Sequence, residues 1–184
     1  MQVPRPATLR RLGAAMALLL FAAGCDTLGL SRKPGPPCPE VMTLRDAGSL
    51  VRYREGPGRD LTDVVFEAKV AGFSGECDYA KDRSRVTLDL GVAFEVLRGP
   101  ANEDRTASFE YFVAVPAFHP APQGKQTFIA KVEFKGNASR TRTGDRIKLV
   151  IPMEKGKTGE DYPVYVGFQL SEEELRDNRK LLPR

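Results

Sequence analysis

The sequence predicts an all-β domain: an antiparallel β-sandwich, immunoglobulin-like or fibronectin-like, of about seven strands with a short C-terminal helix. Three observations predict it. Apolar and polar residues alternate in six or seven separate segments, turn-forming residues rather than helices join those segments, and one segment alone carries helix signals. A closed barrel is the alternative that the same pattern allows.

The 184 residues divide into a signal peptide of residues 1–24, a tether of residues 25–40 and a β-sandwich domain of residues 41–184. The signal contains Arg5, Arg10 and Arg11 and no acid, and an apolar run follows at residues 12–24. This run is shorter than the roughly 20 residues that a membrane-spanning helix needs. It therefore predicts export rather than a permanent transmembrane helix.

The apolar run ends in Ala22-Ala-Gly-Cys25, which looks like a bacterial lipobox, although Ala22 stands where Leu is most common. The thiol of Cys25 would receive a diacylglyceryl group and become the mature N-terminus. Two or three acyl chains anchor a protein stably, whereas one chain alone is marginal. The alternative is an ordinary secretory signal with Cys25 as a plain thiol, and both interpretations export the protein.

The tether contains two of the three cysteines, Cys25 and Cys38. Four prolines occupy the last seven positions of residues 26–40, a composition that favours an extended spacer. With Cys25 lipidated, Cys38 and Cys77 remain as an even pair in an oxidising compartment, which predicts a disulfide. This disulfide would close a loop of 38 intervening residues. It is therefore expected to add roughly 3 to 4 kcal/mol to the free energy of unfolding.

The predicted strands follow the chain from residue 49 to residue 170. A weaker strand spans residues 49–54, and the first strong one spans residues 62–73. In the next strand, residues 86–96, every even position is large and apolar and every odd one is small or polar. Four more alternate in the same way, at residues 109–115, 128–135, 147–151 and 164–170. Such alternation is typical of strands with one buried face.

Turn-rich joints separate these strands, at residues 98–102, 116–124, 135–137 and 155–161. The one predicted helix begins after Ser171, which serves as its N-cap, and Glu174 three residues later completes a capping box. It runs through Leu175 toward Arg179 and ends the domain.

Net charge argues against nucleic acid as a partner. The 28 basic and 24 acidic residues give +4, but removal of the signal's three arginines leaves 25 against 24, a net of +1. A chain so nearly neutral has no global field that attracts polyanions. The basic stretches Arg140–Arg142 and Lys155–Lys157 are interpreted as solvated turns rather than anion sites.

Residues for catalysis are sparse, so we predict no enzyme, no cofactor and no metal. Ser74 lies in Gly72-Phe-Ser-Gly75, which is not the GxSxG elbow of hydrolases. His119 lies in a proline-rich connection, and no second triad member is suggested by spacing. Two isolated thiols and one distant histidine do not make a zinc set.

Two weaker features suggest binding surfaces. Arg59, Asp60 and Asp63, before the first strong strand, form a possible loop binding site, although the EF-hand pattern is missing. The competing interpretation is a turn that caps the strand, with Arg59 paired to an acid. Phe112 and Ile129 fall on nominally polar faces, where they form either a contact patch or covered core.

Seven short motifs resemble those of a family of uncharacterised lipoproteins from Gram-negative bacteria. They are Cys38-Pro39, Asp46-Ala47, Gly58-Arg-Asp-Leu-Thr-Asp-Val64, Gly72-Phe-x-Gly-x-Cys77-x-Tyr79, Arg98-Gly-Pro-Ala101, Tyr111-Phe-Val-Ala114 and Gly167-Phe-Gln-Leu170. The resemblance covers nearly the whole mature chain and implies a lipid anchor and paired cysteines, without implying an activity. By resemblance to enteric lipoproteins, Asp26 directly after Cys25 favours the inner membrane.

Taken together, these features predict an envelope lipoprotein that is anchored in a membrane by lipid and faces the periplasm. Its expected role is a non-catalytic interaction or envelope-assembly module with an envelope protein as partner. The alternative is a periplasmic accessory protein that binds a small ligand or anion through the loop of Arg59, Asp60 and Asp63.

Overall fold

The structure is a computed structural model that describes residues 35–181. The predicted signal, the lipidation site Cys25 and most of the tether lie outside the described residues. Eight strands are present in the described part: β1 (Val41–Thr43), β2 (Ser49–Tyr53), β3 (Val64–Tyr79), β4 (Arg85–Arg98), β5 (Thr106–Ala114), β6 (Lys125–Glu133), β7 (Arg140–Pro152) and β8 (Val164–Phe168). One α-helix, α1 (Glu172–Leu181), follows them.

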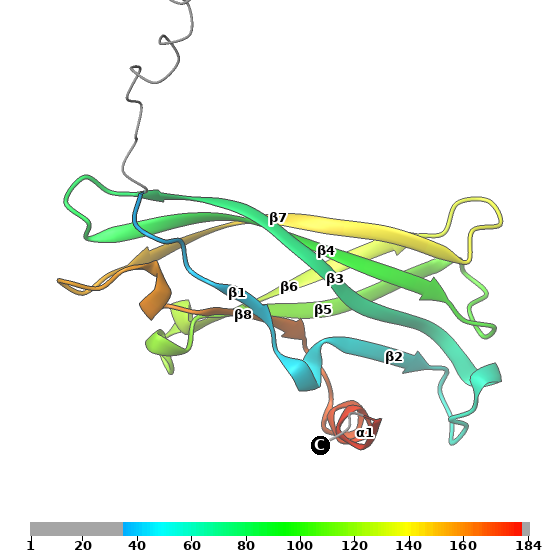
Figure 1. The fold of residues 1–184 in the computed structure, drawn as a ribbon. Helices are drawn as coiled ribbons and strands as arrows, with labels where there is room; N and C mark the ends of the chain where they lie inside the picture. Colours follow the sequence, from blue (N-terminus) through cyan, green and yellow to red (C-terminus); the bar gives the residue numbers. More distant parts are fainter. Residues whose placement is uncertain (1–34, 182–184) are drawn as a thin grey trace, which may run out of the picture. The chain divides into compact units, whose positions relative to one another are not determined.

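The strands form two four-stranded sheets that face each other (Figure 1). The first has the order β1-β8-β5-β6 and the second the order β2-β3-β4-β7. This arrangement confirms the predicted sandwich, and the two separate sheets exclude the closed-barrel alternative. All strand pairs are antiparallel except β1 with β8, which are parallel.

Two of the strand pairings correspond to those of immunoglobulin domains. β4 pairs with β7 in one sheet and β5 pairs with β8 in the other, as strands B with E and C with F do in immunoglobulin domains. β1 departs from that order, because an N-terminal strand lies parallel beside β8. Because β1 has only three residues, its sequence shows no alternation of apolar and polar positions. Among the described strands it is the one that the sequence does not predict.

Two of the strands extend six or more residues beyond their predicted bounds. β3 continues to Tyr79. The apolar pattern at even positions stops earlier, because a register shift between Val70 and Gly72 turns the odd positions inward after it. β7 begins at Arg140, seven residues before the predicted Ile147. The stretch Arg140–Arg142 therefore belongs to a strand and not, as predicted, to a turn.

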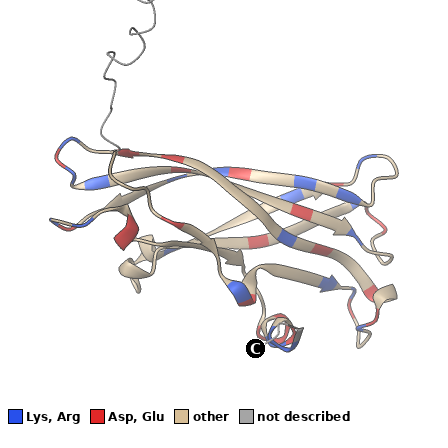
Figure 2. Cartoon of the chain, viewed as in Figure 1, with Lys and Arg blue, Asp and Glu red and all other residues tan. Residues whose placement is uncertain are grey.

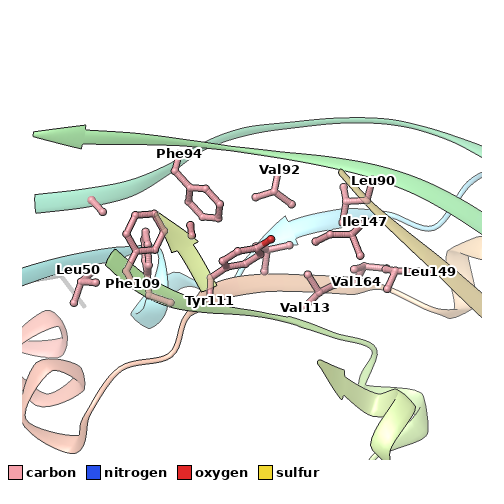
Figure 3. Close-up of a cluster of buried hydrophobic side chains, with 14 of the residues drawn as sticks. Leu50, Leu90, Val92, Phe94, Phe109, Tyr111, Val113, Ile147, Leu149 and Val164 are labelled. Atoms are coloured by element: carbon pink, nitrogen blue, oxygen red, sulfur yellow. The ribbon is translucent and has the colours of Figure 1, made fainter. Parts of the chain in front are cut away.

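The core lies between the sheets and is centred on aromatic rings. Phe94 of β4 packs edge-on against Phe109 of β5, with ring centroids 5.2 Å apart, and Phe109 makes a similar contact with Phe168 of β8. Figure 3 shows Phe94 facing Phe109 and Tyr111 across the gap. The six inward residues of β4 are at most 3% exposed, which follows from their strict alternation in sequence.

Helix α1 begins with the predicted capping box. The amide of Ser171 donates to Glu174 Oε2 at 2.8 Å, and the amide of Glu174 donates to Ser171 Oγ at 3.2 Å. The helix is fastened to the sandwich by Asn178, whose Nδ2 donates to the carbonyls of Asp46 and Ser49. Asp46 lies in the 3-10 helix η1 (Arg45–Ala47) and Ser49 begins β2.

Candidate functional site

The predicted disulfide closes the N-terminal end of the domain. Cys38 is bonded to Cys77 of β3, with the two Cα atoms 5.7 Å apart. Beside it, the hydroxyl of Tyr79 donates to the carbonyl of Pro37 and accepts the amide of Gly159 at 2.7 Å. A Cβ at Gly159 would lie 2.6 Å from the Pro37 carbonyl oxygen. The last residues of the tether are therefore part of the compact unit, which begins at Pro36.

The two acids of the predicted loop site serve the loop itself. Asp60 accepts the amide and the hydroxyl of Thr62 and thereby caps the 3-10 helix η2 (Leu61–Asp63). These hydrogen bonds lower the pKa of Asp60 below its ordinary value. Asp63 is 4% exposed and pairs with Arg54. Both carboxylates are thus engaged within the turn that leads into β3.

Arg59 reaches away from these acids and contacts α1. Its Nη2 lies 3.2 Å from Glu173 Oε1, and its guanidinium carbon lies 5.4 Å from the ring centre of Tyr53. A cleft of about 270 Å³ separates this loop from the helix. The charged residues that line it are Arg52, Arg54, Arg59, Glu55, Glu173, Glu174 and Asp177. Acids outnumber cations there, so the cleft has no excess positive charge for an anion.

The other residues singled out in the sequence lie apart from one another. His119 and Ser74 are both exposed, one after the 3-10 helix η3 (Pro116–Phe118) and one on β3. Within residues 35–181, no group of three or more His, Cys, Asp or Glu is placed to hold a metal ion. Over the same range no helix is long and apolar enough to cross a membrane.

Phe112 and Ile129 have different surroundings. Phe112 is 8% exposed, and the Lys125 ammonium lies 4.5 Å from its ring centre. Ile129 of β6 is 61% exposed. The patch predicted from the sequence is therefore covered at Phe112 and open at Ile129.

Ile129 borders the side of the sandwich where the two sheets end in β6 and β7. Both are terminal strands, and several of their inward positions are not buried: Gln126, Phe128, Thr141, Thr143 and Asp145. A groove of about 440 Å³ lies between the two strands. The sandwich is thus incompletely closed along this side.

The floor of the groove is aromatic and apolar. Tyr111 of β5 is fully buried, and the ring of Phe128 stacks on it with centroids 5.4 Å apart. Ile147 of β7 completes the floor. The Tyr111 hydroxyl donates to Asp145 Oδ2 at 2.7 Å. Burial, and then the hydrogen bond to this carboxylate, raise the pKa of Tyr111 above its ordinary value.

The walls of the groove belong to the most basic part of the domain. Residues 125–148 contain seven cations and two acids, whereas the other described residues contain 15 cations and 21 acids. The seven cations are Lys125, Lys131, Lys135, Arg140, Arg142, Arg146 and Lys148. Figure 2 shows the basic positions recurring along β7. Positive charge is therefore concentrated on this side of a nearly neutral molecule.

Acids of β4 neutralise part of this charge. Glu95 is 5% exposed and lies 2.9 Å from Lys69 and 3.7 Å from both Arg140 and Arg142. The hydrogen bond from Lys69 holds the pKa of Glu95 below its ordinary value. Asp89 pairs with Arg146. Within the described residues, Lys131, Lys135 and Lys148 form no ion pair.

Sequence reasoning did not identify this groove, although one signal for it exists. The inward residues of β7 are Ile147, Leu149 and Ile151, at every second position. Extending this alternation toward the N-terminus of the strand places Asp145, an acid, on the inward face.

Comparisons of the chain with protein-family models, curated proteins and solved structures find no match. The resemblance to Gram-negative lipoproteins therefore stays a prediction.

Proposed function

We propose that this chain is an exported lipoprotein, anchored through Cys25 and facing the periplasm, whose sandwich domain acts without catalysis as an interaction module. The lipobox supports the anchor, and the Cys38–Cys77 disulfide supports an oxidising compartment, because such bonds rarely persist in the cytosol.

The observation that carries the interaction role is the open side between β6 and β7. It combines an aromatic floor, the exposed Ile129 and two lysines, Lys131 of β6 and Lys148 of β7, that form no ion pair within the described residues. Apolar surface rimmed by charged residues is typical of protein interaction sites. The loop of Arg59, Asp60 and Asp63 offers less to a ligand, because all three side chains already have partners within the protein.

The anchor is tested by membrane fractionation of the native protein and of Cys25→Ala, with mass spectrometry of the N-terminal peptide. We expect a diacylglyceryl mass on Cys25 and loss of membrane association in the variant. Thr27→Ala, which leaves the lipobox intact, serves as the control. An unmodified Cys25 on a soluble native protein would overturn the anchor. Separation of the two membranes in the same experiment tests the inner-membrane assignment from Asp26.

The interaction role is tested in intact cells with a photo-crosslinking amino acid at Ile129 or, as a control, at Lys81 in the exposed turn between β3 and β4. We expect a discrete adduct from position 129 that position 81 does not form. The same adducts from both positions, or no adduct from position 129, would contradict the assignment of the contact surface.

A further inference from the structure

We propose that the free edge of β6 is a docking strand. It pairs through backbone hydrogen bonds with an extended segment of a partner protein, and that segment has apolar or β-branched residues at its centre and acids at its ends. This inference rests on the proposed function, since it specifies the class of partner for the same open side of the domain.

The backbone of β6 has unused hydrogen-bonding capacity along one edge. β6 ends its sheet and pairs with β5 alone. In the described part of the chain, no backbone hydrogen bond runs from residues 126–133 to any other element. A row of unpaired amides and carbonyls at a sheet edge is a template for an added strand.

The middle of β6 lacks the features that commonly protect an edge, because it has no charged residue, no proline and no register shift against β5. Its five residues Gln126–Ala130 are uncharged, and Ile129 among them is 61% exposed. The remaining three edges are protected in different ways. β1 has only three residues, the carbonyl of Ser49 in β2 is bonded by Asn178 of α1, and β7 directs the charge of Asp145 inward.

The groove beside β6 gives an added strand somewhere to place its side chains. In an added strand, alternate residues point to opposite faces. Those pointing between the sheets would meet the half-buried Phe128, whose ring stacks on the buried Tyr111. Apolar or β-branched residues fit such a floor, and pockets for alternate side chains are how strand-addition sites gain specificity.

The positive charge around the groove favours acidic residues at the two ends of the partner segment. Lys125 and Lys131 flank the uncharged run of β6, and Arg146 and Lys148 line the groove from β7. These positions complement acids at either end of a strand that lies along β6. A purely electrostatic ligand, such as an anionic membrane surface, would use the cations but neither the strand edge nor the apolar floor.

A second copy of this chain is less well suited as the partner. Its densest acidic segment, Glu172–Glu174, lies in a helix rather than in an extended strand. Each of these acids is also paired within its own chain, with Arg176, Arg59 and Arg52 respectively. A separate acidic protein segment therefore fits the site better.

The test uses the full-length protein purified in detergent and two fluorescein-labelled peptides that match the nine residues of β6 in length. One is Glu-Glu-Val-Thr-Val-Thr-Val-Glu-Glu, and the other has Lys at the four Glu positions. We expect saturable binding of the Glu peptide, seen as a rise in fluorescence anisotropy. Binding of the Lys peptide should be weaker by at least about tenfold, and added salt should weaken binding of the Glu peptide.

Hydrogen exchange locates the bound peptide. A strand added to β6 should slow hydrogen exchange of the β6 amides and leave the exchange of amides around the cleft beside α1 unchanged.

A charge-reversal variant tests the cations of the groove. Lys131→Glu/Lys148→Glu should weaken binding of the Glu peptide by at least about tenfold. The matched control, Lys81→Glu/Lys155→Glu, makes the same change in net charge at exposed turns. Thermal unfolding of both variants should match the native protein, because none of the four lysines forms an ion pair within the described residues.

Several results would overturn the inference. Equal binding of both peptides, or binding that survives Lys131→Glu/Lys148→Glu, would rule out charge-selective docking at this groove. Binding to phosphatidylglycerol vesicles but not to the Glu peptide would make the site a basic membrane surface instead. A dimer in sedimentation velocity that the double variant abolishes would make the occupant a second copy. None of these measurements depends on lipid at Cys25, so failure of the anchor and failure of the docking strand are separable.

Discussion

Tyr111 and Asp145 join the two sheets by a hydrogen bond of 2.7 Å at the edge of the core. Tyr111 belongs to β5 in the first sheet, and Asp145 belongs to β7 in the second. The bond gives a fully buried phenol its polar partner and places a carboxylate at the border of the groove. Its contribution to stability can be measured near neutral pH and again at alkaline pH.

Tyr111→Phe should lower the free energy of unfolding by about 1.5 to 3 kcal/mol near neutral pH, because the variant loses one hydrogen bond to a carboxylate. Urea denaturation followed by circular dichroism measures the change. Tyr165→Phe removes a hydroxyl from a half-buried tyrosine of β8 and should have little effect. An equal loss in both variants would assign the effect to the aromatic side chain in general.

The same pair predicts a pH dependence. Because the pKa of Tyr111 is raised in the folded state above its ordinary 10.0, the protonated phenol stabilises the fold fully below pH 10. That contribution is lost as the pH rises further, since the unfolded chain then releases the proton more readily. The difference in stability between the native protein and Tyr111→Phe should therefore narrow above pH 10. A constant difference would contradict the assignment.

The disulfide should account for a large share of the total stability. Cys38→Ser/Cys77→Ser is expected to lower the free energy of unfolding by about 3 to 4 kcal/mol, because the unfolded chain regains the entropy of a loop whose ends are separated by 39 positions in the sequence. Chemical denaturation measures it. The native protein in excess reductant is the control and should lose the same amount. A smaller loss in reductant than in the variant would show that serine perturbs packing at these positions.

Gly159 should tolerate no side chain. Gly159→Ala places a Cβ within 2.6 Å of Pro37 O and of Pro39 N, both backbone atoms, and overpacking of this kind costs about 1 to 3 kcal/mol. Thermal unfolding detects the loss. Gly35→Ala is the matched control, because nothing lies within 4 Å of the Cβ it would add. Equal melting temperatures for the two variants would mean that the segment around Pro37 moves aside without cost.

Glu95 should stabilise the domain in a pH-dependent way. Its pKa is lowered from the ordinary 4.5, first by the hydrogen bond from Lys69, so its contribution is present above pH 4.5 and disappears as the pH falls through the lower folded value. Glu95→Gln should melt at a lower temperature than the native protein at neutral pH. The two melting curves should converge on acidification. Glu110→Gln, in which no ion pair is lost, should show no such convergence.

The fold was largely predictable because β4 and its neighbours alternate strictly over most of their length. The exceptions have physical causes. The bulge between Val70 and Gly72 reverses which positions of β3 face inward. In the second half of β3 the inward residues are therefore at odd positions, whereas in the first half they are at even positions. The first half of β7 shows no apolar alternation because Thr141, Thr143 and Asp145 line an open side rather than a closed core.

The candidate site was less predictable, since its parts come from strands distant in sequence. The turn role of Asp60 follows from local spacing, and pairing of Arg59 with an acid was anticipated. That the acid is Glu173, 114 residues away, depends on the packing of α1. The groove likewise requires β6 and β7 to be terminal strands of different sheets, a fact of topology that single-strand periodicity does not contain.

The disulfide at Cys38 also determines how the domain would bear mechanical load. A pulling force applied to the chain before Cys38 would be transmitted along two paths. One path follows the backbone into β1, which has three residues. The other crosses the disulfide into β3, which pairs with β4 from Phe66 to Tyr79. The second path carries force into one of the two longest strand ladders among the described residues. Reduction would redirect it to β1, which can peel from β8 one residue at a time.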